Sequence, residues 1–185
     1  CECAARWERK MILDINYSDA AYGECEADER IDEGLIERAA KHLLAAELLG
    51  KLDEAALSKA GELPVYISVS IVSEGEIREL NGEFRGIDSV TDVLSFPQFE
   101  NSDELLAELD GDEAGVNIPM GDVVICLDQA ERQSQEYETS IKREVTYLFV
   151  HSLLHLLGYD HMQPEEKAEM REHEERIMTA LDICR

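Results

Sequence analysis

The sequence predicts a single α+β domain in which about five to six helices pack on a four-stranded mixed sheet. The chain has 185 residues, the length of one domain, with 44% hydrophobic and 32% charged residues, a balance typical of globular proteins. Segments with strand-like alternation and segments with helical periodicity follow one another along the chain. No repeat or linker interrupts them, so we expect residues 11–185 to form one domain after an unpatterned N-terminal extension, residues 1–10.

The first half of the chain alternates strands and helices. Residues 11–17 (MILDINY) alternate like a half-buried strand, and residues 32–49 have the apolar spacing of a helix. Residues 65–72 (VYISVSIV) are rich in β-branched side chains and have the length of a strand. The S-x-x-E capping box that follows them predicts a helix over residues 73–84.

The second half contributes two more strands and three helices. Residues 93–97 (VLSFP) predict a short strand ended by proline, and residues 121–127 (GDVVICL) predict another. Residues 100–119, between these strands, are acidic and punctuated by glycine, so we expect a solvated excursion with one helical turn. The three helices are expected at residues 128–137, 140–157 and 164–181.

The net charge argues against one class of function. Aspartate and glutamate number 42 against 17 lysines and arginines, which gives a formal charge of -25. Such a charge repels polyanions at long range, so we do not expect non-specific nucleic-acid binding through a broad basic face.

Cysteine usage and hydropathy predict a cytoplasmic location. The five cysteines have no repeated spacing, which argues against a disulfide framework and favours a reducing compartment. Cys1 and Cys3 could bind a metal together, but isolated thiols at a terminus more often have no function. Residues 1–10 lack the apolar region of a signal peptide, and the longest apolar run, residues 145–158, is shorter than the roughly 20 residues of a membrane span. We therefore expect no membrane partner.

Three of the five histidines fall within one short segment, VHSLLHLLGYDH, residues 150–161. His151 and His155 are four residues apart on a predicted helix, so their side chains project from the same face. Gly158 can adopt the left-handed conformation that ends a helix, which lets the chain fold back and bring His161 towards the other two. Three imidazoles with one open position suit a catalytic zinc ion, so we expect one Zn²⁺ per chain on this C-terminal helix and the following turn.

A plainer interpretation is open for every histidine. His151 and His155 could be hydrogen-bonded core residues and His161 a loop residue, but their joint spacing around a glycine favours the metal. The remaining two, His42 and His173, lie in helical segments and are interpreted as structural or solvated residues.

The spacing H-x-x-x-H-x-x-G-x-x-H also matches the zinc site of metzincin peptidases. In those enzymes a glutamate follows the first histidine and acts as general base. Here that residue is Ser152, which cannot take a proton from water near neutral pH without a partner. A peptidase would therefore need a carboxylate from elsewhere. Glu144 is a candidate, and a solvated or capping role is the alternative for it.

Two segments resemble those of a known family. HSLLHLLGYDH, residues 151–161, is similar to the signature of the YbeY family of bacterial endoribonucleases, in which a small residue follows the first histidine. LNGEFRGIDSVTDVLSFP, residues 80–97, resembles the family's other segment and precedes the first in the same order. Val90 stands where proline is usual and Ser152 where glycine is common, and neither residue is a predicted ligand.

The resemblance implies a function and a set of site residues. The function is that of a zinc-dependent, single-strand-specific endoribonuclease acting in rRNA processing, for maturation of the small-subunit rRNA, and in ribosome quality control. It implies that His151, His155 and His161 bind the zinc and that Arg85, from the family's Arg-Gly pair, is the catalytic residue. A guanidinium can hold a phosphate bidentately and stabilise charge on its oxygens. Without the family, Arg85 would be interpreted as a surface residue at a helix end.

The expected partners are single-stranded RNA, including rRNA, and a basic ribosomal protein of the small subunit, whose charge would attract this acidic chain; no DNA is expected. Asp92 and Asp160 are weaker candidates that could orient a ligand histidine, and Arg78 could assist Arg85. Two alternatives from other classes stay open: a zinc metallopeptidase, and a non-catalytic ribosome-assembly factor that keeps its zinc for stability.

Overall fold

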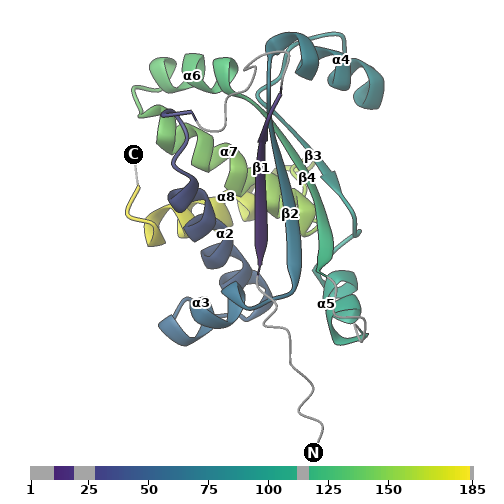
Figure 1. Ribbon diagram of the computed structural model, residues 1–185, viewed down its shortest axis with the longest axis vertical. Coiled ribbons are helices and arrows are strands. Elements are labelled where there is room, and N and C mark those ends of the chain that lie inside the picture. The colour runs from purple at the N-terminus through teal and green to yellow at the C-terminus, as the bar shows by residue number, and fades with distance from the viewer. Residues whose placement is uncertain (1–10, 19–27, 112–116, 184–185) are drawn as a thin grey trace, which may run out of the picture.

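The computed structural model describes residues 11–18, 28–111 and 117–183, and the expected extension over residues 1–10 lies outside these ranges. Four strands form one sheet in the order β1-β2-β4-β3 (Figure 1). They are β1 (Ile12–Tyr17), β2 (Val65–Val72), β3 (Val93–Pro97) and β4 (Ile118–Cys126). The pairs β1–β2 and β2–β4 are parallel and β3–β4 is antiparallel, so the prediction of a four-stranded mixed sheet is confirmed.

Seven helices lie within the described ranges, compared with the five to six that were expected. They are α2 (Glu33–Leu48), α3 (Glu54–Gly61), α4 (Glu74–Arg85), α5 (Ser102–Gly111), α6 (Leu127–Glu136), α7 (Ile141–Leu156) and α8 (Pro164–Ala180). The unexpected helix is α3, which has only eight residues and buries only Ala56 and Ala60, too few apolar positions for a periodic signal. Its start is fixed by Asp53, whose side chain accepts a hydrogen bond from the backbone N–H of Ala56 at 2.8 Å.

The acidic segment after β3 contains more helix than was expected. It forms the ten-residue helix α5 where a single turn was expected, and Leu105 of this helix is fully buried. Asp103 and Glu104 lie in the first turn of α5, where negative charge is favourable to the helix dipole. Strand β4 also begins at Ile118, three residues before the predicted start, because Ile118 pairs with Val65 of β2.

Helices cover both faces of the sheet. The main core lies between the sheet and the helices α2 and α7, with Val123 and Ile125 of β4 pointing into it. The neighbouring residues Val124 and Cys126 point to the other face, where they pack with Ile77 of α4. This alternation is the two-residue period of a strand, and it places α4 and α7 on opposite sides of the β3–β4 edge (Figure 1).

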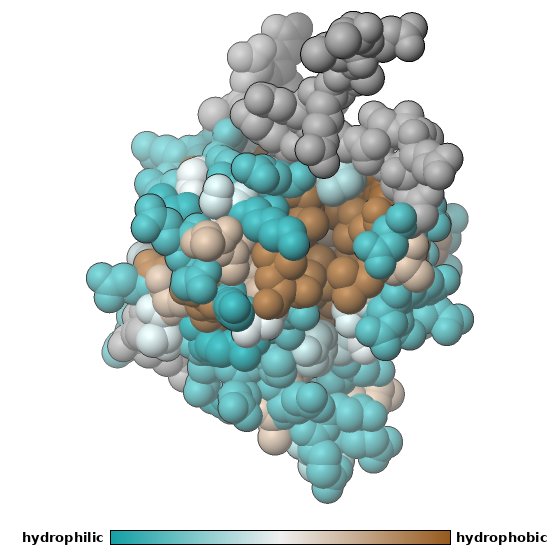
Figure 2. Space-filling view, turned by 90° about the horizontal axis from the view of Figure 1, so that it is seen from below, coloured by the Kyte–Doolittle hydropathy of each residue, from teal (hydrophilic) through white to brown (hydrophobic). Residues whose placement is uncertain are grey.

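The surface is mostly hydrophilic, as the high content of charged residues requires. Seen from below, hydrophilic side chains cover much of that face and apolar side chains gather near its centre (Figure 2). In the described part of the chain, no helix combines the length and the apolar character needed to cross a membrane.

Candidate metal centre

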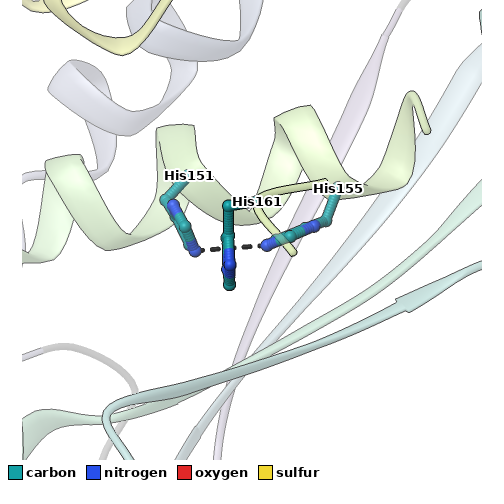
Figure 3. A group of neighbouring side chains, drawn as sticks. All are labelled: His151, His155 and His161. Atoms are coloured by element: carbon teal, nitrogen blue, oxygen red, sulfur yellow. Dashed lines mark hydrogen bonds between the residues drawn. The ribbon is translucent and has the colours of Figure 1, made fainter. Parts of the chain in front are cut away.

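The structure brings three histidines together at the C-terminal end of α7. His151 and His155 lie one turn apart on this helix, and His161 comes from the turn that follows it (Figure 3). One ring nitrogen from each of the three lies within 4.8 Å of the others. The Nε2 atoms of His151 and His155 are 3.2 Å apart, and the three rings face a common point.

Gly158 makes this return of the chain possible. Its φ is +90°, a conformation that side chains other than glycine rarely adopt. A Cβ atom on Gly158 would lie 2.5 Å from the carbonyl oxygen of Glu100 and 2.8 Å from Cα of Asn101. The residue therefore has to be glycine both for its backbone angle and for the close approach of the chain before α5. The prediction that Gly158 ends the helix in a left-handed conformation is confirmed.

A buried carboxylate holds His151. Nδ1 of His151 lies 2.7 Å from Oε1 of Glu174 on α8, and Glu174 is only 4% exposed. The hydroxyl of Tyr147 donates to the other carboxylate oxygen at 2.8 Å, and burial, with the nearby Glu174, raises the pKa of Tyr147 so that it stays protonated. With Nδ1 engaged by Glu174, Nε2 is the ring nitrogen of His151 that can turn towards a metal.

A backbone carbonyl orients the ring of His155, as Glu174 orients the ring of His151. Its Nδ1 donates to the carbonyl oxygen of Tyr159 at 2.8 Å, which leaves a lone pair on its Nε2. Burial lowers the pKa of His155, and His151 beside it lowers the pKa further, so His155 is held in the neutral form that binds metals. The two Nε2 atoms lie 3.2 Å apart, at hydrogen-bonding distance, and both are turned towards the point that a metal ion would occupy.

The spacing of the Nε2 atoms of His151 and His155 fits zinc. Tetrahedral zinc with Zn–N bonds of about 2.0–2.1 Å places two ligand nitrogens roughly 3.3–3.4 Å apart. The observed Nε2–Nε2 distance of 3.2 Å is close to that value. Three histidines also leave a fourth position open, and His161 is exposed, so the site is accessible from solvent.

Asp160 acts on the backbone of the turn. Its Oδ1 accepts a hydrogen bond from the backbone N–H of His161 at 2.7 Å, which fixes the turn that carries the third histidine. Asp92, the other residue expected to orient a histidine, contacts the side chain of Gln133 at 2.8 Å instead. Its other oxygen accepts from the hydroxyl of Thr91 and the backbone N–H of Val93, which fits the alternative interpretation of Asp92 as a turn residue.

The two other histidines lie apart from this group. His173 of α8 contacts Oε1 of Glu47 at 2.8 Å, and His42 contacts the carbonyl oxygen of Arg38 at 2.7 Å, so both have the structural roles that were expected. Within the described ranges, no other set of three or more ligating side chains clusters in this way. Cys1 and Cys3 lie outside those ranges.

A cavity of about 620 Å³ adjoins the histidines, and His151 and His161 form part of its wall. Glu144 also lines it and is 3% exposed, so the expected solvated role for this residue is wrong. Its carboxylate accepts from the hydroxyl of Thr139 at 3.4 Å and lies 3.5 Å from the guanidinium of Arg143.

Arg85 lies at the C-terminal end of α4, exposed, and is followed by Gly86 with φ 71°. It is not among the residues that line the cavity. Phe84, beside it, packs edge-on against Phe96 of β3 at 5.0 Å between ring centroids, so this helix end lies at the edge strand of the sheet. Arg78 pairs with Asp88 through two contacts of 2.6 and 2.9 Å, which joins α4 to the loop that leads to β3.

Sequence reasoning missed Glu174. Helix α8 is rich in glutamate and was interpreted as a surface helix, yet Glu174 lies on the stripe of buried residues that includes Met170, Ile177 and Met178. These positions are three or four residues apart, the spacing of one helix face. A glutamate on the apolar face of a helix was therefore the signal that could have identified it.

Comparison with known proteins finds a family model and relatives that match most of the chain. The family model for the endoribonuclease YbeY matches residues 25–182. The Endoribonuclease YbeY of Clostridium botulinum (strain Eklund 17B / Type B) is 49% identical over 146 residues, which are 74% of this chain and 88% of that protein. The one from Clostridium beijerinckii is 38% identical over 181 residues, which are 91% of this chain and 98% of that protein. The solution structure of a Thermotoga maritima protein covers 91% of this chain and 90% of its own, at 25% identity and a TM-score of 0.49.

Proposed function

The chain belongs to the YbeY family of endoribonucleases, as its two signature-like segments predicted, and on this premise we propose that it is a zinc-dependent endoribonuclease specific for single-stranded RNA. Its substrate is rRNA, its role is small-subunit rRNA maturation and ribosome quality control, and residues 11–185 form the catalytic domain. The family membership supports the reaction class. The geometry of the site supports the metal and the roles of Glu174 and Asp160, and the resemblance of residues 80–97 to the family's segment supports the role of Arg85.

One observation carries the proposal. The Nε2 atoms of His151 and His155 approach to 3.2 Å while the Nδ1 atom of each ring is engaged by an oxygen acceptor. The two Nε2 atoms are thus the ones turned towards a common point, an arrangement that suits a metal ion. His161 supplies the third nitrogen, and we assign one Zn²⁺ per chain to these three residues. When bound, zinc supplies Lewis-acid chemistry: it polarises a phosphoryl oxygen and lowers the pKa of water.

The protein's own residues would orient the ligands and hold the phosphate. Glu174 keeps the ring of His151 in one tautomer, and Asp160 fixes the turn that carries His161. Arg85 is the proposed catalytic residue: its guanidinium would bind the phosphate and stabilise the charge that develops on its oxygens. The loop that follows Arg85 leads to Asp92, which lines the cavity beside the histidines.

The acidic surface supports delivery by a partner. With a net charge of -25 the protein repels free RNA at long range, whereas a basic ribosomal protein of the small subunit would be attracted to it. We propose that such a protein brings the enzyme to the rRNA in the cytoplasm.

The proposal is tested by zinc analysis of the purified full chain together with cleavage assays. Four substrates separate the possibilities: a short single-stranded RNA, the same RNA as a duplex, its DNA counterpart and casein. We expect one zinc per chain and cleavage of the single-stranded RNA alone. Cleavage of casein without RNA would identify a metallopeptidase. Bound zinc with no cleavage of any substrate would identify the assembly factor.

A further inference from the structure

An exposed aromatic ring lies beside the proposed catalytic arginine. Phe84, which precedes Arg85 on α4, is 60% exposed, and among the large hydrophobic side chains of the described ranges only Met162 is more exposed. Ile87 and Val90, in the loop after the helix, are exposed as well. Single apolar side chains are common on protein surfaces, whereas three within residues 84–90 form a local apolar surface next to Arg85.

The ring of Phe84 is held by a neighbour that leaves it open to a ligand. It packs against Phe96 of β3 with 5.0 Å between the ring centroids and 69° between the ring planes. A T-shaped pair covers at most one face of either ring, so at least one face of Phe84 is not covered by Phe96. A flat aromatic face in a fixed position next to an arginine is therefore available at this end of α4.

Hydrogen bonds also fix the loop that follows α4. The backbone N–H of Ile87 donates to the carbonyl oxygen of Asn81 at 3.2 Å, and the side-chain amide of Asn81 donates to the carbonyl oxygen of Ser89 at 2.8 Å. Asn81 is only 3% exposed, so the loop is anchored to the buried side of the helix. The ion pair of Arg78 with Asp88 adds a second anchor. A surface that is ordered in advance loses less entropy when it binds a ligand.

The charge of the chain favours an apolar contact with RNA. The net charge is -25, and Glu79 and Glu83 are exposed on the same helix, so phosphates away from Arg85 meet negative charge. Stacking of a base on an aromatic side chain needs no attraction between opposite charges, and it contributes to affinity in proteins that bind single strands. A base therefore suits this surface better than a further phosphate does.

The size of the surface also suits one base. A stable protein interface takes roughly 20–30 residues from each partner, and the apolar surface beside Arg85 consists of three side chains. One aromatic ring is enough to stack one base.

We propose that Phe84 stacks on an unpaired base of the RNA, in the nucleotide next to the phosphate that Arg85 holds, and that Ile87 and Val90 extend the apolar surface around it. The inference rests on the proposed function and adds to it a residue that selects single strands. In a duplex the bases stack on one another and their faces are not available to a side chain, whereas in a single strand they can be splayed out. Phe84 is thus a positioning residue, and its loss affects KM more than kcat.

The stacking is tested by steady-state kinetics of the zinc-loaded full chain on a ten-nucleotide single-stranded RNA. Phe84→Ala should raise KM by on the order of tenfold, the scale of losing one stacked base, with a much smaller change in kcat. Phe84→Leu keeps an apolar side chain against Phe96 but has no flat face, so it should raise KM nearly as much. Phe84→Trp should keep the parental KM or lower it. Ile12→Ala is the control, because it removes an exposed apolar side chain from β1, at the opposite edge of the sheet.

A parental KM in Phe84→Leu would overturn the stacking, because apolar bulk alone would then suffice. This variant also carries the test if Phe84→Ala does not fold. A parental KM on free RNA combined with a loss of stimulation by a basic ribosomal protein would overturn it too, and would identify the surface as a protein contact.

A strand without bases separates stacking from an effect on the fold or on the phosphate. The substrate is a ten-nucleotide abasic strand, which keeps the sugar–phosphate backbone. The wild type should have a raised KM on it, and Phe84→Ala should cause almost no further increase. An equal increase in KM on the normal and abasic strands would mean that Phe84 does not contact a base, and the inference would fail.

A fluorescence measurement gives a readout that does not depend on cleavage. The sequence has one tryptophan, Trp7, so the double variant Trp7→Phe, Phe84→Trp places the only indole at position 84. Stacking of a base quenches indole fluorescence, and we expect quenching on rapid mixing with the RNA and much less with the abasic strand. Equal signals with the two strands would overturn the stacking.

These outcomes are separate from a failure of the proposed function. If the wild type does not cut single-stranded RNA but the indole is quenched by its bases, the endoribonuclease proposal fails and the stacking site stands. If the wild type cuts RNA while the Phe84 variants keep the parental KM and no quenching occurs, the endoribonuclease proposal stands and the stacking site fails.

Discussion

Glu174 of α8 accepts a hydrogen bond from Nδ1 of His151 on α7, at 2.7 Å, from a position that is 4% exposed. The two residues are 23 positions apart in the sequence, and the contact joins the last helix to the helix that carries the candidate ligands. A buried carboxylate costs free energy unless it is paired, so this contact and the one from Tyr147 explain why Glu174 is tolerated in the core.

The contact predicts that Glu174 strengthens metal binding. Glu174→Ala should weaken zinc affinity by on the order of 10–100-fold, the usual effect of removing a carboxylate that orients a ligand histidine. Glu174→Gln should have a smaller effect, because its amide oxygen still accepts from Nδ1 while the negative charge is lost. Zinc affinity is measured by competition with a chelator. Glu172→Gln, at an exposed position of the same helix, is the control and should bind zinc normally.

The three-histidine site predicts loss of metal when one ligand is removed. His155→Ala should reduce the zinc content of the purified protein from one per chain to near zero, because the two remaining nitrogens bind too weakly to retain it. Metal content is measured by elemental analysis after dialysis. His42→Ala, outside the cluster, should keep its zinc. Stoichiometric zinc in the His155→Ala protein would refute the site.

Much of the fold could be predicted from sequence because the core strands carry strong local signals. Residues 65–72 are rich in β-branched side chains and alternate between buried and half-buried positions over most of their length, so the strand prediction and β2 agree to the residue. Helix α3 was not predicted because only two alanines of it are buried, too few to give a periodic apolar pattern. The segment of α5 was predicted to be solvated because of its acidic residues, although Leu105 is inserted into the core. Both are cases in which tertiary contacts, rather than local pattern, determine the structure.

The candidate site also contains some residues that could be predicted from sequence and others that could not. His151, His155 and His161 could be grouped from sequence because a helical turn and one glycine bring them together locally. Glu174 and the cavity wall could not, because they depend on how α8 packs against α7, and no short-range pattern encodes that packing. The position of Arg85 relative to the histidines likewise depends on how α4 and α7 lie on opposite faces of the sheet.

Gly158 should be required for both stability and metal binding. Gly158→Ala places a methyl group 2.5 Å from the carbonyl oxygen of Glu100 and forces a positive φ on alanine. We expect a loss of more than about 1–2 kcal/mol in the free energy of unfolding, together with weaker zinc binding. Gly50→Ala is the matched control, because Gly50 also has a positive φ, +66°, but nothing lies within 4 Å of a Cβ there. Equal losses in the two variants, measured by chemical denaturation, would show that the close contact is not important.

Arg85 is predicted to act on the phosphate and not on the metal. Arg85→Ala should retain one zinc per chain and lose RNA cleavage by on the order of a hundredfold or more, as expected when one charge contact in the transition state is removed. Arg85→Lys should recover part of the rate, since an ammonium keeps the charge but cannot bind a phosphate bidentately. Arg38→Ala, an exposed arginine on α2, is the control and should cut RNA normally. Parental cleavage by Arg85→Ala would show that the assigned role is wrong.

The net charge of -25 predicts an unusual dependence of the rate on salt. At low salt the protein repels an approaching RNA strand, and added salt screens that repulsion, since the Debye length is about 10 Å at 0.1 M and about 3 Å at 1 M. Salt also weakens the local contacts of Arg85 with phosphate, so the two effects oppose each other. A basic nuclease has only the second effect, and its activity falls steeply with salt. Here we expect cleavage of a short RNA to be flat or to rise modestly between about 0.05 and 0.2 M, and then to fall.

A rate-versus-salt series on the zinc-loaded protein checks this expectation, first alone and then with a basic ribosomal protein of the small subunit. Opposite charges attract most strongly at low salt, so the partner should raise the rate most at the lowest salt concentration. A bovine albumin addition, which is acidic, controls for crowding and should not raise it. A steep decline from the lowest salt in the absence of a partner would mean that RNA meets an extended basic track on its way to the metal centre. The acidic surface would then not govern the approach of the substrate, and delivery by a partner would no longer be needed to explain how this protein reaches RNA.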